Sequence, residues 1–289
     1  MLFKNQYHYF IAGLPDFNFE STKLPFTVEE FKEMLYDELK PSDKRLIDTY
    51  FLKYDNDNLL ALLKNKESAL NSLGRFESEE ILETIDAIKN ELPVDKKRIP
   101  PLYETFIKKW LDEDAQKQGK RWEDLLADLY MEYGLEVKNS LISQWFELNL
   151  NLGNILTAIY AKKYKMDVPS LIVGNNAIAK RIRDNANLRD FGLSSEVDYF
   201  ETLQRISEEK DIYERERKID KFRWEWLDEK TTFHYFDIEY IFAYLCKLQI
   251  LERWVALNAE EGERVFRELI HQLKKEIDIP KDDASDRRG

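Results

Sequence analysis

The sequence predicts an all-α protein with at most a short extended segment near its N-terminus. Charged residues make up 35% of the 289-residue chain, and only 9 residues are Gly. High charge with scarce Gly suits long solvated helices and suits sheets and tight turns badly. Apolar residues recur at steps of three and four, which indicates amphipathic helices. The 43% hydrophobic content provides enough material for a packed core.

The N-terminal elements can be assigned from breaker and capping residues. The segment Tyr7–Pro15 is aromatic and is interrupted by Gly13, so we expect a short strand or a buried lead-in. A helix follows Thr27, because Thr27 and Glu30 have the spacing of a capping box. Pro41 ends this helix.

Two further helices complete the first third of the chain. One starts near Ser42, and the other starts at Ser78 and is closed by Pro93. The stretch 93–101 contains three prolines and a basic run. We therefore place the first module boundary there.

The middle and final thirds are again helical. Two helices follow the boundary, and we expect Gly134 to end the second. Regular apolar steps from Asn139 to about Lys165 predict a long amphipathic helix, which the segment 168–174 interrupts. A basic segment and several more helices follow, and we expect the polar tail 280–289 to be frayed.

Charge and cysteine content limit the classes of partner and compartment. The 44 basic and 56 acidic residues give a net charge of −12, which argues against nucleic acid as the main partner. Cys246 is the only cysteine, so no internal disulfide can form and a reducing compartment is expected. No apolar run reaches the ~18 residues of a membrane span, and no signal peptide is evident. We expect a cytoplasmic protein.

Three segments of the chain resemble one another. In each, a side-chain amide lies eight residues after a bulky apolar or aromatic residue and just before an apolar pair. The amides belong to Asn58, Asn154 and Gln249, which are 96 and 95 residues apart. We interpret these residues as markers of three related helical modules at 1–98, 99–192 and 193–289. The other interpretation is that any long helical protein offers such matches.

The residues around the second and third markers resemble the C/d subunit family of V-type and A-type ATPases. In that family an Asn precedes an apolar pair and a basic residue follows, as in 151–163 here, with 168–174 after it. The segment 243–262 looks like the closing motif of that family, and 7–16 is similar to a bacterial group found with V-type ATPase components. Two departures are Gln249 in place of Asn, and Lys162-Lys163 in place of an arginine-rich pattern.

The resemblance implies a function as well as a fold. It implies three helical-bundle modules around a pseudo-threefold axis in a funnel shape. It implies a non-catalytic rotor adaptor that links the central shaft to the membrane proteolipid ring and so couples ATP hydrolysis elsewhere to proton or sodium transport. The partners would be shaft subunits and the ring, with membrane contact only peripheral, at the inner face, and no small-molecule substrate.

The sequence gives no catalytic, cofactor or metal site that we can name. It has no GxxxxGK[ST] loop and no GxGxxG after a strand, so we do not expect the chain to bind ATP itself. His8, His234 and His271 lack metal-ligand spacing. Glu268 and His271 form a single ExxH pair, whereas a di-iron helical bundle needs two. Cys246 lies in an apolar stripe and is expected in the core.

A basic cluster is the candidate docking site for a partner. It follows the second repeat helix in an otherwise acidic chain, and either an acidic partner helix or lipid headgroups would suit it. The other interpretation is ordinary solvated surface. The cluster comprises Lys162, Lys163, Lys165, Lys180, Arg181, Arg183 and Arg189.

Two other functions stay open at this point. A free-standing helical scaffold of solenoid type would show the same helical repeats. An enzyme could build its site from scattered carboxylates. Co-purification with shaft and ring proteins would favour the adaptor, whereas a ligand or metal in the purified chain would favour the enzyme.

Overall fold

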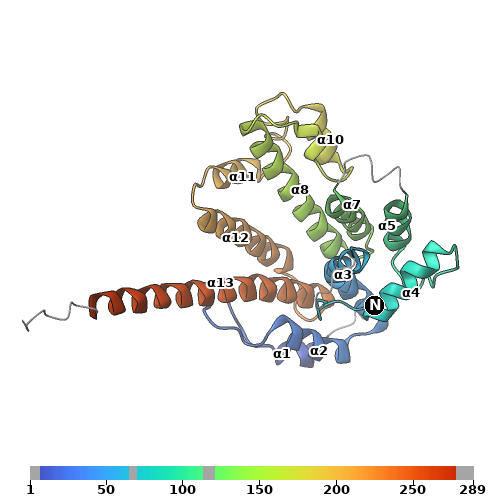
Figure 1. The fold of residues 1–289 in the computed structure, drawn as a ribbon, viewed down its shortest axis with the longest axis horizontal. Helices are drawn as coiled ribbons and strands as arrows, with labels where there is room; N and C mark the ends of the chain where they lie inside the picture. The colour runs from blue at the N-terminus through green and yellow to red at the C-terminus, as the bar shows by residue number, and fades with distance from the viewer. Residues whose placement is uncertain (1–6, 65–69, 113–120, 278–289) are drawn as a thin grey trace, which may run out of the picture.

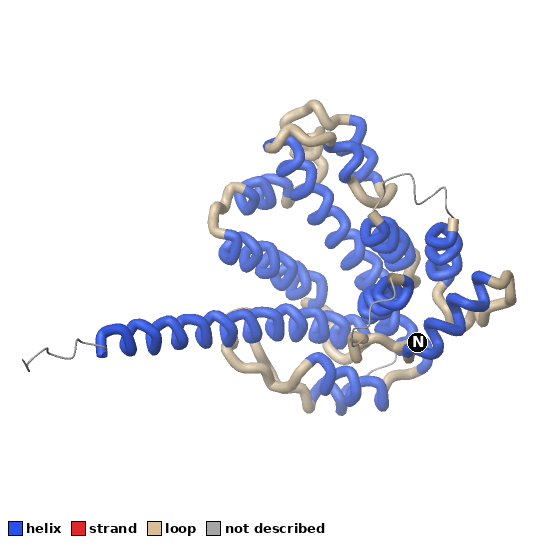
Figure 2. Tube along the Cα trace, in the orientation of Figure 1, coloured by secondary structure: helices blue, strands red, loops and turns tan. Residues whose placement is uncertain are grey.

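The computed structural model describes residues 7–64, 70–112 and 121–277. It is 68% helix, and the described residues contain helices and loops but no strand (Figures 1 and 2). The prediction of an all-α fold is confirmed. The helices are α1 (His8–Ala12), α2 (Val28–Glu38), α3 (Pro41–Leu63), α4 (Ser78–Lys89), α5 (Pro101–Leu111), α7 (Trp122–Leu135), α8 (Ser140–Lys163), α9 (Val168–Leu171), α10 (Ala177–Asp184), α11 (Phe200–Ser207), α12 (Ile212–Thr231) and α13 (Ile238–Ile277).

Of the two expectations for the N-terminal segment, the short strand is wrong, because residues 8–12 form the short helix α1. Two contacts hold its start in place. The backbone N–H of Tyr7 donates to the carbonyl of Phe236 at 2.6 Å, and the Tyr7 hydroxyl donates to Asp43 Oδ2 at 2.5 Å. Tyr7 and Ile11 are buried, so the segment is a buried lead-in of helical form.

The helix starts follow the capping signals of the sequence. The Thr27 side chain accepts the Glu30 N–H, and Glu30 accepts the Thr27 N–H at 2.7 Å, which completes the predicted capping box. Pro41 was expected to end α2, but α2 ends at Glu38 and Pro41 is the first residue of α3. This first helical position needs no backbone N–H. A second capping box, of Glu77 and Glu80, starts α4.

Gly134 has a different role from the predicted helix end. It is buried in the last turn of α7, which continues to Leu135. A Cβ at this position would lie 2.1 Å from Cδ1 of Phe146 on α8. The glycine therefore lets α7 and α8 approach closely, and Glu136 is the C-cap residue.

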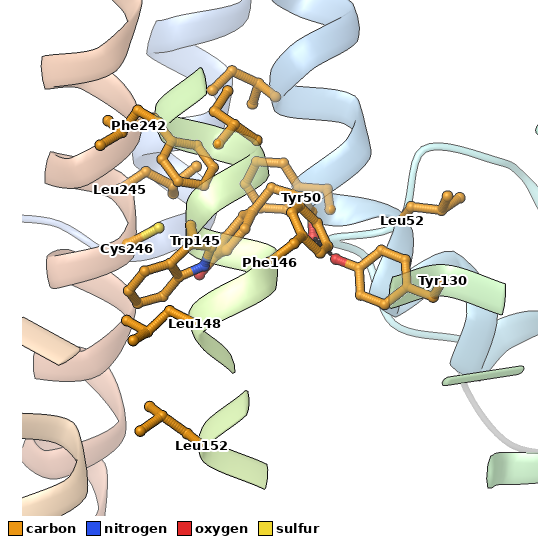
Figure 3. Packing of buried hydrophobic residues seen from close by; sticks show 14 of the residues in the cluster. Tyr50, Leu52, Tyr130, Trp145, Phe146, Leu148, Leu152, Phe242, Leu245 and Cys246 are labelled. Atoms are coloured by element: carbon orange, nitrogen blue, oxygen red, sulfur yellow. Dashed lines mark hydrogen bonds between the residues drawn. The ribbon is translucent and has the colours of Figure 1, made fainter. Parts of the chain in front are cut away.

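One buried cluster runs from Tyr7 to Leu248 and joins most of the helices. Figure 3 shows its centre, where Tyr50 of α3, Phe146 of α8 and Phe242 of α13 lie together. The predicted boundaries at 98/99 and 192/193 fall in segments between helices, but the core is shared. The division into three modules around a pseudo-threefold axis stays a prediction.

The last helix, α13, has 40 residues and extends well beyond the rest of the structure (Figure 1). Its first half packs against α2, α8 and α12. The tail 280–289, expected to be frayed, lies outside the described residues. Among the described helices, none combines the length and the apolar character that crossing a bilayer requires.

Two glycines on neighbouring helices give a matched test of this packing. Gly134→Ala should lower the free energy of unfolding by about 1–3 kcal/mol, because the new methyl group overlaps the Phe146 ring. Gly153→Ala, in α8, should raise it by about 0.5–1 kcal/mol, because a Cβ there meets no atom within 4 Å. Urea unfolding of both variants measures the two values, and a neutral Gly134→Ala would contradict the close approach.

Candidate functional site

The first two repeat markers make the same pair of hydrogen bonds. Asn58 Oδ1 accepts the Asn71 N–H at 2.8 Å, and its Nδ2 donates to the Asn71 carbonyl at 3.1 Å. Asn154 Oδ1 accepts the Val173 N–H at 2.9 Å, and its Nδ2 donates to the Val173 carbonyl at 2.7 Å. Each marker thus binds both polar groups of one loop residue. We call this arrangement the amide clamp.

A second polar residue supports each clamp one helical turn earlier. Asp55 Oδ1 accepts the backbone N–H groups of Arg75 and Phe76 at 2.6 and 3.0 Å. Asn151 Oδ1 accepts Nδ2 of Asn176 at 2.7 Å. These contacts fix the loops that lead into α4 and α10. The first two segments therefore share a structural device that the sequence repeat alone did not reveal.

The third marker, Gln249, behaves differently. Its side chain bonds to α3, where Oε1 accepts from the Tyr50 hydroxyl and from Lys53 Nζ, the latter at 2.5 Å. Its Nε2 bonds to the Tyr54 hydroxyl. Gln249 therefore joins α13 to α3 across the centre of the protein, and it holds no loop.

All three repeat helices line one cavity of about 610 Å³, which we call the central cavity. Tyr50 of α3 and Phe146 of α8 lie eight residues before their markers, and Lys53 and Asn149 lie five residues before. The first two helices thus face the cavity in the same register. The third helix contributes residues from Cys246 to Ala256, and α12 adds Asp220 and Arg223.

A buried carboxylate organises the polar side of the cavity. Asp220 is 2% exposed. Its Oδ1 accepts from Arg223 at 2.7 Å, and its Oδ2 accepts from Arg253 at 2.9 Å and from the Trp254 indole N–H at 3.0 Å. Arg223 also donates to Asn149 Oδ1 at 2.9 Å. A buried charge needs such partners, and this network ties α12, α8 and α13 together.

Burial also shifts the titration of two cavity side chains. It lowers the pKa of Lys53 to about 8, against the opposing effect of the nearby Cys246 and Asp57. It raises the pKa of the Cys246 thiol to about 12. Cys246 is 1% exposed, so the expected core position is confirmed.

The predicted basic cluster is partly used inside the protein. Lys162 donates to the carbonyls of residues 186–188, at 2.9 Å for Asn187. Arg183 donates to the carbonyls of Ile172 and Gly174 at 2.8 and 2.7 Å. Arg181 donates to the Gly192 carbonyl at 3.3 Å and pairs with Glu196. These three side chains stabilise the loops around α10.

The other cations of the cluster, Lys163, Lys165, Lys180 and Arg189, are exposed. None of these four has a carboxylate partner among the described residues. Any test of docking by this cluster must therefore change these residues, because reversing Arg181 or Arg183 would remove contacts that hold the loops.

Sequence reasoning missed two surface features near the start of α13. Four aromatic side chains lie exposed at or beside the turn between α12 and α13: Tyr9 at 97%, Phe233 at 86%, Tyr235 at 62% and Phe236 at 37%. Exposed apolar groups gathered in this way are typical of binding surfaces. Their separation in sequence, at residue 9 and at residues 233–236, hid the grouping.

His234, Asp237 and Glu239 place one ligand atom each within 4.8 Å of one another. Each already has a protein partner. His234 Nδ1 lies 2.7 Å from Asp237 Oδ2, Asp237 Oδ1 accepts the Tyr240 N–H at 3.1 Å, and Glu239 accepts from Asn139 at 3.2 Å. The group caps the start of α13. His8 stacks on Phe236, with ring centroids 4.3 Å apart, and the Glu268 and His271 side chains lie outside the described part.

The amide clamp can be tested by deletion. Asn154→Ala should lower the free energy of unfolding by about 1–3 kcal/mol, because both polar groups of Val173 lose their partner. Asn90→Ala is the control, since Asn90 is exposed and bonds only to its own helix; its cost should stay below about 1 kcal/mol. Equal losses in urea unfolding would show that the clamp contributes nothing special.

Lys53 provides a pH-dependent test of cavity burial. Its pKa is near 8 when folded and 10.5 when unfolded, so the unfolded chain binds the extra proton between these values. Stability should therefore gain a contribution as pH rises through this window, by up to about 3 kcal/mol. Lys53→Met should lack that contribution, and Lys89→Met, on the exposed end of α4, should keep it. The raised pKa of Cys246 lowers stability as pH rises, but Cys246 is present in the parent and in both variants. Identical pH profiles would contradict the burial of a charged Lys53.

Comparison with known proteins places the chain in a family. No curated protein matches it, and no solved structure matches it. A family model described as a protein of unknown function (DUF2764) matches residues 4–277, nearly the whole chain. The chain therefore belongs to the DUF2764 family.

Proposed function

We propose that this protein is a non-catalytic adaptor in the rotor of a V/A-type ATPase, where it links the central shaft to the proteolipid ring at the inner face of the membrane. The observation that carries the proposal is the central cavity, because all three repeat helices line it. A cavity built from repeated helices around one centre suits the capture of a protein segment that enters between them.

The lining of the cavity suits the end of a partner polypeptide. Trp145, Phe146 and Tyr130 form an aromatic wall, while Lys53, Arg223 and Arg253 add cations to the lining. Aromatic residues and Arg are the side chains that contribute most to protein–protein binding. A volume of about 610 Å³ accommodates several side chains of an inserted segment.

The rigidity of the structure supports a mechanical role. The two amide clamps fix the loops that lead into α4 and α10, and the Asp220 network fixes α8, α12 and α13 to one another. Close-packed interiors transmit strain and absorb little of it. Torque applied at the cavity would therefore reach the rest of the protein with little loss.

The contact between the resembling patches adds support. Asn154 and the segment 168–174 are both parts of the likeness to the C/d subunit family, and Asn154 binds the backbone of Val173 directly. The same interaction recurs at Asn58. The amide clamp thus gives the first two copies of the sequence repeat a common structural role, in addition to their similar sequences.

The carboxylates of the cavity favour a structural role over catalysis. Asp220 binds Arg223, Arg253 and Trp254, and Glu252 accepts the backbone N–H of Val28 at 2.9 Å. General acid–base catalysis needs a carboxylate that can exchange a proton with a substrate. Both carboxylates are instead engaged in holding helices together.

Co-expression with the shaft and ring subunits tests the proposal. The protein should co-purify with shaft subunits, and Ala256→Trp should abolish this, because an indole at this lining position fills the mouth of the cavity. Leu257→Trp is the matched control, since Leu257 is 40% exposed on the same helix and does not line the cavity. Both variants should keep the parent circular dichroism spectrum.

Two results would reject the adaptor. One is a protein that purifies without shaft or ring subunits under conditions in which the ATPase remains assembled. The other is equal retention of the shaft by Ala256→Trp and by Leu257→Trp, which would exclude the central cavity as the docking site.

A further inference from the structure

Two adjoining pockets beside α2, α3 and the loops before α4 and α5 have strongly basic walls. The larger has a volume of about 460 Å³ and the smaller about 90 Å³. Arg75 and Arg98 line both pockets, so the two pockets adjoin, and we call them together the basic pocket. It is separate from the central cavity, with which it shares no lining residue.

The cations of the basic pocket come from four separate segments. Lys32 lies on α2, and Lys44 and Arg45 lie in the first turns of α3. Arg75 precedes α4, and residues 96–98 precede α5. Among the described residues, Asp48 is the only carboxylate that lines either pocket. Seven cations against one carboxylate stand out in a chain with a net charge of −12.

Some of these cations already have partners. Arg75 pairs with Asp48 at 3.2 Å, Arg98 pairs with Glu80, and Lys96 lies 3.9 Å from Glu104. These contacts hold the guanidinium groups of Arg75 and Arg98 at the boundary between the two pockets. Lys32 and Lys44, in the larger pocket, take no part in these ion pairs.

Lys32 and Lys44 face the same aromatic ring. Their Nζ atoms lie 5.6 and 4.6 Å from the centre of the Tyr36 ring. Lys32 Nζ also donates to the carbonyls of Leu73 and Gly74 at 2.8 and 3.0 Å, which fixes its position. Neither ammonium group has a carboxylate within salt-bridge distance among the described residues. Burial lowers the pKa of Lys32, the carboxylates of Asp55, Asp48 and Glu29 oppose this shift, and Lys44 adds to the effect of burial.

We propose that the basic pocket binds a small ligand through a phosphate group. The ammonium groups of Lys32 and Lys44 match the charge of a phosphate monoester dianion, and the Arg98 guanidinium, on a side chain that is 62% exposed, adds a third charged donor. Such a ligand would also relieve the mutual repulsion of Lys32 and Lys44. The pocket is too small for a nucleic acid backbone, which the overall negative charge would repel.

This site is independent of the adaptor role. It lies on α2, α3 and the loops before α4 and α5, and a ligand there would bridge these elements. Bound phosphate would therefore stabilise the first module. Two sources carry the same chemistry, namely a soluble phosphorylated molecule and a lipid with a phosphomonoester headgroup.

Calorimetry with inorganic pyrophosphate, at constant ionic strength, tests the soluble source. Co-sedimentation with phosphatidic acid vesicles tests the lipid source, with phosphatidylglycerol vesicles as the phosphodiester control. The variant Lys44→Gln/Arg98→Gln removes two cations of the pocket, and Lys89→Gln/Lys221→Gln removes two exposed cations outside it. Urea unfolding checks that both variants fold.

We expect the parent to bind one or both probes and Lys44→Gln/Arg98→Gln to bind at least about tenfold more weakly, since each charged hydrogen bond contributes more than a factor of ten. Lys89→Gln/Lys221→Gln should bind like the parent. Absence of binding to both probes would overturn the proposal. So would binding that the pocket variant leaves unchanged, or that the two variants weaken equally.

Discussion

Buried side-chain amides hold the connecting loops of this protein against its long helices, and much of the structure depends on them. Asn58 and Asn154 are each 3% exposed, and each binds the N–H and the C=O of one loop residue. A loop that lies on a helix must satisfy its backbone polar groups there, because water has little access. The clamps meet this requirement and so fix where α4 and α10 begin. The basic pocket follows from one of them, since Arg75 lies in the loop that Asp55 and Asn58 hold.

The third repeat helix uses its amide in another way, and the central cavity is the result. Gln249 is one methylene longer than Asn and reaches across to α3. The bonds to Tyr50, Lys53 and Tyr54 join the last helix to the first repeat helix, while the Asp220 network joins it to α8 through Arg223. Polar contacts therefore surround a space that the aromatic side chains leave unfilled. The cavity wall is therefore asymmetric, because α3 and α8 use their marker amides in the same way and α13 does not.

Periodic and local features could be predicted from the sequence, whereas features assembled from distant residues could not. The Thr27 capping box and the helix from Ser140 to Lys163 depend on spacing within one segment, and the structure confirms both. The helical form of residues 8–12 depends on Asp43 and Phe236, and the role of Gly134 depends on Phe146 of the next helix. The markers Asn58 and Asn154 could be recognised in the sequence. Their loop partners could not, because these lie 13 and 19 residues further along the chain. The cations of the basic pocket lie between residues 32 and 98 in four separate segments, so no local charge run revealed it.

The burial of the single cysteine has a practical consequence for measuring the internal motions of the protein. Cys246 is covered where α3, α8 and α13 meet (Figure 3), and the protein environment keeps its thiol protonated. A thiol reagent reacts with the thiolate and needs access to the sulfur. Modification of the native chain therefore needs an opening motion that exposes the sulfur, and its rate reports how often that motion occurs. The rate of Cys246 modification in the wild-type chain therefore measures opening at the junction of the repeat helices, and no label has to be introduced.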